Sequence, residues 1–313
     1  MVIKPSLEDS WSKLRWANSI YLSLTAEIDA VEKQRSHRFT VKVAPDSGEY
    51  SFYVHDLPAM ETTWGLRMGD CLHSARCALD YLMVGLVALG TGQSRKDVAD
   101  VQFPIYQERS RFNGAVGDLK KNQVLAGWLS RVEELQPFNA GNPSIWGWSE
   151  DGFGDEHMPR LPLGLDRLTI LDNIDKHRCI LHPYVGPKLW GGSLDAPTGF
   201  KFLSGSTPME PLNEGSLIGQ VRYETPLPGS WEPAQEDLKR NYPIQVSFGE
   251  PSLDKSVVRI LAWCLWAVEA TLKIFEPVFL HRKPPLLVTA SLPPQPAALD
   301  DRTSSFSSPK APR

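Results

Sequence analysis

The chain has 313 residues, of which 42% are hydrophobic and 22% are charged, so it can bury a sizeable core and is not expected to be disordered as a whole. Its 33 basic and 37 acidic residues give a formal net charge of −4 at pH 7. This balance excludes a global electrostatic field that would hold nucleic acid by counterion release alone, so any contact with nucleic acid has to be local.

Cysteine usage and the first residues indicate the cellular compartment. The cysteines show no paired CxxC spacing, which argues against a zinc ribbon or a disulfide framework and favours core thiols in a reducing compartment. The first residues, MVIKPSLEDSW, lack the apolar stretch of a signal peptide, and no apolar run reaches the roughly 18 residues that span a bilayer. We therefore expect a cytoplasmic protein that does not associate with membranes. The four cysteines are Cys71, Cys77, Cys179 and Cys264.

The first half of the chain predicts helices around one hairpin. Apolar residues recur at intervals of three and four over residues 6–34, which predicts an amphipathic helix. Alternating apolar residues on both sides of Pro45-Asp-Ser-Gly48 predict a β-hairpin over 38–54. A proline-free segment rich in Leu, Ala and Met predicts a long helix over 62–89, and helical turns follow over 113–135. Residues 138–160, rich in Gly, Pro, Trp and Asp, are expected to form a long loop.

The second half predicts two further helices that flank a β-rich segment. Helical spacing returns over 161–181, with Pro162 tolerated in the first turn. A small β-rich insertion is expected over 185–250, an apolar helix over 252–276, and a disordered tail rich in Pro, Ser and Ala over 284–313. The predicted fold class is therefore mainly α, of the α+β kind. We expect one domain over residues 1–283: an antiparallel helical bundle with a β-hairpin after the first helix and a small β-rich insertion before the C-terminal helix.

The first of two polar clusters lies in the predicted 62–89 helix. At about 100° per residue, four polar residues fall on one stripe: Asp70, His73, Arg76 and Asp80. An ordinary solvated helix face would explain such a stripe. However, its continuation by three and four residues reaches Val84 and Val87, so the same face turns apolar and is expected to be covered there. This change favours a cleft.

The second polar cluster is Leu171-Asp-Asn-Ile-Asp-Lys-His-Arg178, towards the end of the predicted 161–181 helix. Asn173 and His177 are four residues apart and are expected at the edge of the buried face, where polar side chains need partners. Asp172 and Lys176 are spaced as a surface ion pair, and Lys176 and Arg178 suit the negative end of the helix dipole. Capping therefore explains these cations as well as ligand binding does. For His177, a structural and a functional role stay open.

These clusters carry a resemblance to a widespread bacterial family, frequent in actinobacteria, that has no assigned activity. Its members typically read LHNLRSALDHL where this chain has Leu72 to Leu82, so Ser74-Ala75 and Tyr81 depart from the pattern. The resemblance covers roughly residues 8 to 182 and implies a common fold and a common site without naming a reaction. The segments that carry it are Gly48-Glu-Tyr, Gly69 to Tyr81, Phe103-Pro-Ile, Leu135-Gln-Pro-Phe and Leu171 to Arg178.

A weaker resemblance is to the HEPN helical domains, many of which are metal-independent ribonucleases of toxin and antiviral systems. Their mark is an Arg followed four to six residues later by His, usually with a polar residue directly after the Arg. The segment Arg76-Cys-Ala-Leu-Asp-Tyr81 lacks both the polar follower and the histidine. If the ribonuclease chemistry is kept, His177 or His73 must supply the acid or base, and Arg76 must stabilise the pentavalent phosphate.

The leading hypothesis is that the two clusters face each other and form one site for RNA or another anionic ligand, which requires the side chains of Arg76 and His177 to converge. The catalytic candidates are Arg76, His177 and His73. The ligand-binding candidates are Asp70, Asp80, Asn173, Asp175, Lys176 and Arg178. The expected partner is RNA or an anionic small molecule, a homodimer stays open, and no cofactor is expected because the chain has no G-x-G-x-x-G, Walker-type or G-x-S-x-G motif.

Two alternatives stay open beside this hypothesis. The clusters can form a structural polar network in a non-catalytic interaction or scaffold protein. They can also bind zinc, iron or manganese, although no H-E-x-x-H or E-x-x-H pair supports this. The ligands of such a metal site would be Asp70, His73, Asp80 and His177. The cysteines show no obvious activating partner, even though Cys179 lies two residues from His177, and are expected to be inert buried thiols.

Overall fold

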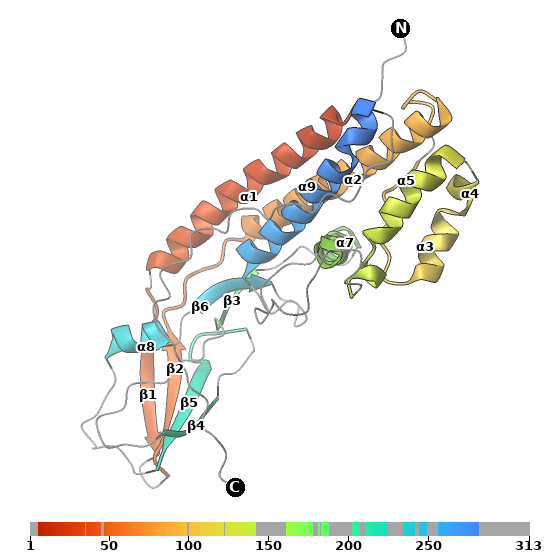
Figure 1. The fold of residues 1–313 in the computed structure, drawn as a ribbon. Helices are drawn as coiled ribbons and strands as arrows, with labels where there is room; N and C mark the ends of the chain where they lie inside the picture. Colours follow the sequence, from red (N-terminus) through yellow and green to blue (C-terminus); the bar gives the residue numbers. More distant parts are fainter. Residues whose placement is uncertain are drawn as a thin grey trace, which may run out of the picture.

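The computed structural model describes most of the chain, and its helices gather at one end and its larger sheet at the other (Figure 1). The predicted loop beyond residue 141 and the predicted tail over 284–313 lie outside the described residues. The described residues are 6–34, 36–44, 47–98, 100–121, 123–141, 161–177, 181, 183–187, 202–206, 211–224, 234–241, 244–248 and 256–281.

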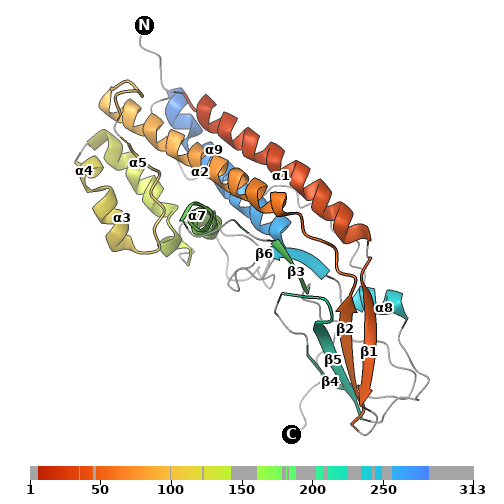
Figure 2. The same cartoon turned by 180° about the vertical axis from the view of Figure 1, so that it is seen from behind.

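Three long helices form the body of the bundle. Helix α1 (Glu8–Gln34) runs antiparallel to α2 (Thr62–Thr91) and to α9 (Val257–His281), and the three lie side by side in both views (Figures 1 and 2). Helix α7 (Leu161–His177) is seen nearly end-on in both figures, so it crosses this layer, and it packs on α2 and α9. The mainly α fold predicted from apolar periodicity is confirmed.

The helical core is built around α2, which is buried on nearly every face. Trp64, Met68, Leu72, Leu79 and Leu86 of α2 are all 1% exposed or less and pack among the apolar residues of α1, α5, α7 and α9. In the described part of the chain, α2 is the one helix whose length and composition would suffice to cross a membrane. Because 67% of its apolar window is buried inside the structure, the same composition is accounted for by its place in the core.

The helical turns predicted over 113–135 are broken into shorter pieces. They form α3 (Arg109–Ala115), α4 (Gly117–Lys120) and α5 (Gln123–Glu134), followed by the 3-10 helix η1 (Pro137–Asn139). Val116 separates α3 from α4 with a non-helical φ of −106° and ψ of 6°. Gly114 and Gly117 flank this residue, and glycine is a poor helix former, so the break lies where helix propensity is lowest.

Two helix ends differ from the prediction. Helix α7 ends at His177, four residues before the predicted end, while α9 continues past its predicted end at 276 to His281. The extension passes through Pro277, which normally ends or kinks a helix. Val278 and Phe279 beyond it are buried in the helical core, and this burial favours continuation of the helix.

The predicted hairpin shares a sheet with two strands of the β-rich insertion. Strands β1 (Arg38–Ala44) and β2 (Glu49–His55) pair antiparallel from Arg38↔His55 to Ala44↔Glu49. Strand β5 (Leu217–Tyr223) pairs with the other edge of β2, and β4 (Phe202–Ser206) pairs with β5, giving the order β1-β2-β5-β4. A second sheet pairs β3 (Pro183–Pro187) with β6 (Ile244–Phe248).

The larger sheet has a small apolar core of its own. Its inner face carries Phe39, Tyr50 and Phe52, and α8 (Gln235–Asn241) adds Leu238 to the same cluster. The Gln235 side chain fixes α8 to the edge strand by accepting a hydrogen bond from the Phe39 amide and donating one to the Phe39 carbonyl, both at 2.8 Å. These two bonds cover part of an otherwise open strand edge.

Gly164 sets the distance between α7 and α9. A Cβ atom at this position would lie 2.7 Å from the Ala267 Cβ and 2.9 Å from the Trp263 Nε1. Because the Ala267 Cβ is fixed to the α9 backbone, Gly164→Ala must push the helices apart, and we expect the free energy of unfolding to fall by about 1–3 kcal/mol. Urea denaturation followed by circular dichroism measures the change.

The control is Gly127→Ala in α5, where nothing lies within 4 Å of an added Cβ. This substitution should leave stability unchanged or raise it by up to about 1 kcal/mol, since alanine favours a helix over glycine. Equal effects of the two substitutions would contradict the close α7–α9 approach.

Candidate functional site

One partly exposed stripe runs along the otherwise buried helix α2. Asp70, His73 and Tyr81 are exposed, and Cys77 and Asp80 are half-buried, at steps of three and four along the helix. Two observations differ from the expectation. Arg76, a predicted member of the stripe, is buried, and the stripe includes Cys77, which was expected to be an inert buried thiol. Beyond Tyr81, Val84 is half-buried and Val87 is buried, so the stripe does turn apolar and covered.

Arg76 and Asp80 hold the backbone of Phe103. The Arg76 Nη2 donates a hydrogen bond to the Phe103 carbonyl at 2.5 Å and lies 3.3 Å from the Asp80 Oδ1, which accepts a hydrogen bond from the Phe103 amide at 2.9 Å. Both polar backbone groups of Phe103, whose side chain is fully buried, are thereby satisfied. The guanidinium therefore anchors the extended segment at 101–106 through its Nη2, while its buried Nη1 has no hydrogen-bond partner within the described residues, and its predicted catalytic role stays a prediction.

The second cluster, on α7, packs against the α2 stripe. Asp172 is buried, and its carboxylate lies 2.7 Å from the Lys176 Nζ and 3.4 Å from the His73 Nδ1. The expected Asp172–Lys176 pair is present, although Asp172 lies in the interior and not on the surface. Asp175 lies so close to Gly69 of α2 that an added Cβ would collide with its carboxylate. Glycine at this position is therefore what lets α7 approach α2.

The remaining predicted residues of α7 are not part of this contact in the described structure. Asn173 is exposed. His177 is the last residue of α7 and its side chain is not among those described, and Arg178 lies outside the described residues. The convergence of Arg76 and His177 therefore stays a prediction.

The α2–α7 contact concentrates negative charge. Burial, followed by repulsion from Asp172 and Asp70, raises the pKa of Asp175 above its ordinary value. Three carboxylates thus lie near one another beside His73. Within the described residues, however, no group of three or more His, Cys, Asp or Glu side chains is arranged to hold a metal ion. The metal-binding alternative finds no support in this part of the chain.

Cys77 has a polar neighbour that sequence reasoning missed. Its Sγ lies 3.5 Å from the Nε2 of His73, one helical turn away, so the expectation that no described cysteine has an activating partner is wrong for this one. Cys71 and Cys264 fit that expectation: both are fully buried, and burial raises the pKa of Cys71 to about 12 and that of Cys264 further. The i,i+4 spacing of His73 and Cys77 was the available signal.

An open groove of about 1040 Å³ adjoins the same stripe, between α1, α2 and the segment at 95–102. Two aromatic side chains in it are exposed, Trp16 at 60% and Tyr81 at 40%. Its lining residues are Asp9, Ser12, Lys13, Trp16, Asp80, Tyr81, Val84, Arg95, Lys96, Val98, Asp100, Val101 and Gln102. None of the groove residues on α1 or at 95–102 was among the predicted site residues.

Some charges in this groove are already paired and others are not. Arg95 donates hydrogen bonds to the Asp9 carboxylate at 2.8 Å and to the Tyr81 carbonyl at 3.2 Å, so it joins α1 to α2. Asp80 is engaged by Arg76. Lys13 and Lys96 have no ion-pair partner within the described part of the chain. The groove therefore offers two available ammonium groups beside two exposed aromatic rings.

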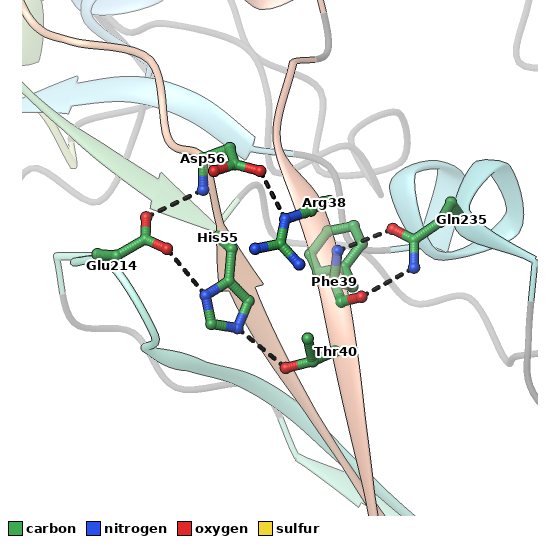
Figure 3. Close-up of polar contacts among 7 residues, drawn as sticks. All are labelled: Arg38, Phe39, Thr40, His55, Asp56, Glu214 and Gln235. Carbon is green, nitrogen blue, oxygen red and sulfur yellow. Dashed lines mark hydrogen bonds and ion pairs between the residues drawn. The ribbon is translucent and has the colours of Figure 1, made fainter.

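A separate polar cluster lies on the larger sheet, at the end of β2 from which the chain leads to α2 (Figure 3). The His55 Nδ1 lies 2.8 Å from the Glu214 Oε1, and its Nε2 lies 2.9 Å from the Thr40 hydroxyl. The second Glu214 oxygen accepts a hydrogen bond from the Asp56 amide at 2.9 Å. Asp56 has a left-handed φ of 54°, and its carboxylate accepts a hydrogen bond from Arg38 at 2.6 Å. Since Thr40 and Glu214 are exposed, we interpret this cluster as a clasp that fixes the end of β2.

Comparison of the chain with protein-family models, with curated proteins and with solved structures gives no match. The functional argument therefore depends on the geometry of the α2 stripe and the groove.

The pKa of Asp80 predicts how stability varies with pH. Burial raises this pKa above the ordinary value of 3.8, while Arg76 and the Phe103 amide oppose the rise. The folded state thus holds the Asp80 proton more tightly than the unfolded state, a stabilisation present below pH 3.8 and lost as pH rises through the folded pKa. Relative to Asp80→Asn, the native chain should become less stable from acid to neutral pH, as measured by urea denaturation at each pH.

Asp118→Asn is the matched control, because a hydrogen bond from Lys121 lowers the pKa of this exposed carboxyl group. The Asp118–Lys121 pair is present at neutral pH and lost on acidification. The stability of the native chain relative to Asp118→Asn should therefore change with pH in the opposite direction to its stability relative to Asp80→Asn. A pH-independent difference between the native chain and Asp80→Asn would contradict the prediction.

The sheet clasp predicts energetic coupling between His55 and Glu214. In a double-mutant cycle of His55→Ala and Glu214→Ala, we expect a coupling of about 0.5–1.5 kcal/mol in the free energy of unfolding, since the pair shares a hydrogen bond. Urea denaturation of the four proteins measures it. Strictly additive effects would show that the clasp contributes nothing to the fold.

Proposed function

We propose that the groove between α1, α2 and the segment at 95–102 binds a nucleotide unit, either free or within single-stranded RNA. The observation that carries the proposal is the presence of exposed Trp16 and Tyr81 in the same groove as Lys13 and Lys96. Aromatic rings stack on bases of any sequence, and nearby ammonium groups bind the phosphates. A cytoplasmic location, where such ligands are present, is part of the proposal.

The size and charge of the groove support this ligand class. A volume of about 1040 Å³ is at the upper end of the range for small-ligand sites, which leaves room for a nucleotide and its neighbours. With Arg95 paired to Asp9 and Asp80 paired to Arg76, the unpaired charges in the lining are Lys13, Lys96 and the exposed Asp100. They leave a small positive excess, which compensates locally for the negative net charge of the chain.

The proposal concerns binding and does not extend to the RNA cleavage that the HEPN resemblance implied. Cleavage of that kind needs an arginine side chain at the scissile phosphate, and here the Arg76 guanidinium is buried and bound to the Phe103 carbonyl. The Arg76–Asp80–Phe103 network instead favours the second candidate, in which part of the polar cluster is structural and the chain acts as a non-catalytic binding protein.

Removal of a stacking ring or a phosphate-binding charge should weaken binding. We expect Tyr81→Ala and Trp16→Ala each to lower the affinity for a fluorescein-labelled oligouridylate by about fivefold to a hundredfold, the cost of one lost base stack. Lys13→Glu should weaken binding and also reduce its dependence on salt concentration. Fluorescence anisotropy at two or more salt concentrations measures both effects.

Lys33→Glu serves as the control, because it makes the same charge change on α1 outside the groove lining. It should leave the affinity close to that of the native chain. If Lys13→Glu and Lys33→Glu behaved alike, or if the native chain bound neither the oligouridylate nor uridine monophosphate, the proposed function would be wrong.

A further inference from the structure

Three side chains from α2 and α7 stand in a row at the stripe beside the groove. The Cys77 Sγ lies 3.5 Å from the His73 Nε2, and the His73 Nδ1 lies 3.4 Å from the Asp172 Oδ1. The two ring nitrogens of one imidazole thus face a thiol on one side and a carboxylate on the other. This is the order of groups by which a nucleophile is activated through a base that a third group orients.

The exposure of the three groups suits these roles. His73 is 50% exposed in its side chain and Cys77 is half-buried, so both can be reached from solvent. The Asp172 side chain is only 5% exposed, and its Oδ2 is held by Lys176 at 2.7 Å. Its Oδ1 is buried and has no hydrogen-bond partner within the described residues, and the His73 Nδ1 lies 3.4 Å from it.

We propose that Cys77 is a nucleophile for acyl transfer, with His73 as its general base and Asp172 as the residue that positions the imidazole. The Cys77 sulfur attacks the carbonyl carbon of an ester or thioester, and its proton passes to the His73 Nε2. The carbon–oxygen or carbon–sulfur bond to the leaving group then breaks, and the leaving group takes that proton. A water molecule next attacks the Cys77 thioester, its proton passes through the same nitrogen to the Cys77 sulfur, and the carboxylic acid is released.

The electrostatics of the site account for the need for a base. Burial raises the pKa of the Cys77 thiol, so at neutral pH the sulfur is protonated and its proton must be removed during attack. The positive charges of Lys13 and Lys176 act on this sulfur and oppose the rise, whereas Asp80 and Asp172 reinforce it. The same two ammonium groups favour the negative charge that develops beside the sulfur in the transition state.

The leaving group of the acyl donor determines the substrate class. A tetrahedral intermediate expels the group of lower pKa, because the weaker base leaves faster. Thioesters and activated esters have leaving groups that compete well against the Cys77 sulfur, whereas simple amides do not. Lys13 and Asp80 act on Cys77 and also line the groove, so an acyl donor can approach from that side. The proposal does not depend on nucleotide binding there.

Acetylation by p-nitrophenyl acetate tests the proposal on the full chain. The native protein should release a burst of p-nitrophenolate and carry one acetyl group on the peptide that contains Cys77, as found by mass spectrometry. Neutral hydroxylamine should remove this group, since it cleaves a thioester and leaves an acetylated lysine intact. Cys77→Ala should abolish the burst. His73→Gln should slow acetylation of Cys77 by about a hundredfold, the usual contribution of a general base.

Asp172→Asn tests the positioning role through the pH dependence of the reaction. Because Asp172 helps to raise the pKa of the Cys77 thiol, loss of its charge should move the half-maximal acetylation rate to lower pH, whereas loss of its contact with the His73 ring should lower the maximal rate itself. His55→Gln on the sheet is the control for His73→Gln, because it replaces a histidine by glutamine away from Cys77. It should leave the burst of p-nitrophenolate unchanged. Melting temperatures verify that each variant is folded.

One comparison needs no variant. Unfolding of the native sequence in urea exposes its thiols but separates Cys77 from His73 and Asp172. The rate of Cys77 acetylation, divided by the fraction of Cys77 present as thiolate, should therefore be lower in the unfolded chain than in the folded chain. Equal rates in the folded and unfolded chain, equal rates for native and His73→Gln proteins, or acetyl groups found on lysines alone would each overturn the proposal.

Discussion

Burial of α2 on all sides but one is the constraint on which the rest of the structure depends. Its apolar faces are covered by α1, α9, α7 and α5, and this packing leaves a single stripe that can hold polar side chains without a large desolvation cost. The polar side chains that enter the interior next to this stripe form two groups, although the Arg76 Nη1 and the Asp172 Oδ1 have no hydrogen-bond partner within the described residues. Arg76 and Asp80 share the backbone of Phe103, and Asp172 is shared by Lys176 and His73.

Because α7 lies close to α2, carboxylates of α7 lie beside the side chains of the α2 stripe. Gly69 leaves space for the Asp175 carboxylate, and Gly164 leaves space for Ala267 on the opposite side of α7. A side chain at Gly164 would push α7 away from α9, and a side chain at Gly69 would displace the Asp175 carboxylate. Two glycines in helices, where they normally weaken the structure, are therefore explained by the close approach that they allow.

The sequence contained enough information for the helices and for part of the site. Apolar periodicity located α1, and a proline-free segment rich in Leu, Ala and Met located α2, each to within two residues at each end. It could not reveal that β5 pairs with β2, since that pairing joins residues more than 160 positions apart and leaves no local pattern. For the same reason the link between Arg76 and Phe103 was missed, even though both residues belong to the segments singled out by the resemblance.

The stripe itself shows why charged residues alone were a poor guide to its centre. At about 100° per residue, Cys77 falls between Asp70 and His73 on the helical wheel, whereas Arg76 falls roughly 40° beyond Asp80, at the margin that meets the 101–106 segment. From this margin the long Arg76 side chain extends to the Phe103 carbonyl and has a structural role. A small thiol at the centre stays accessible beside the imidazole one turn before it. The residue type drew attention to Arg76, but the angular position favours Cys77 as the reactive group.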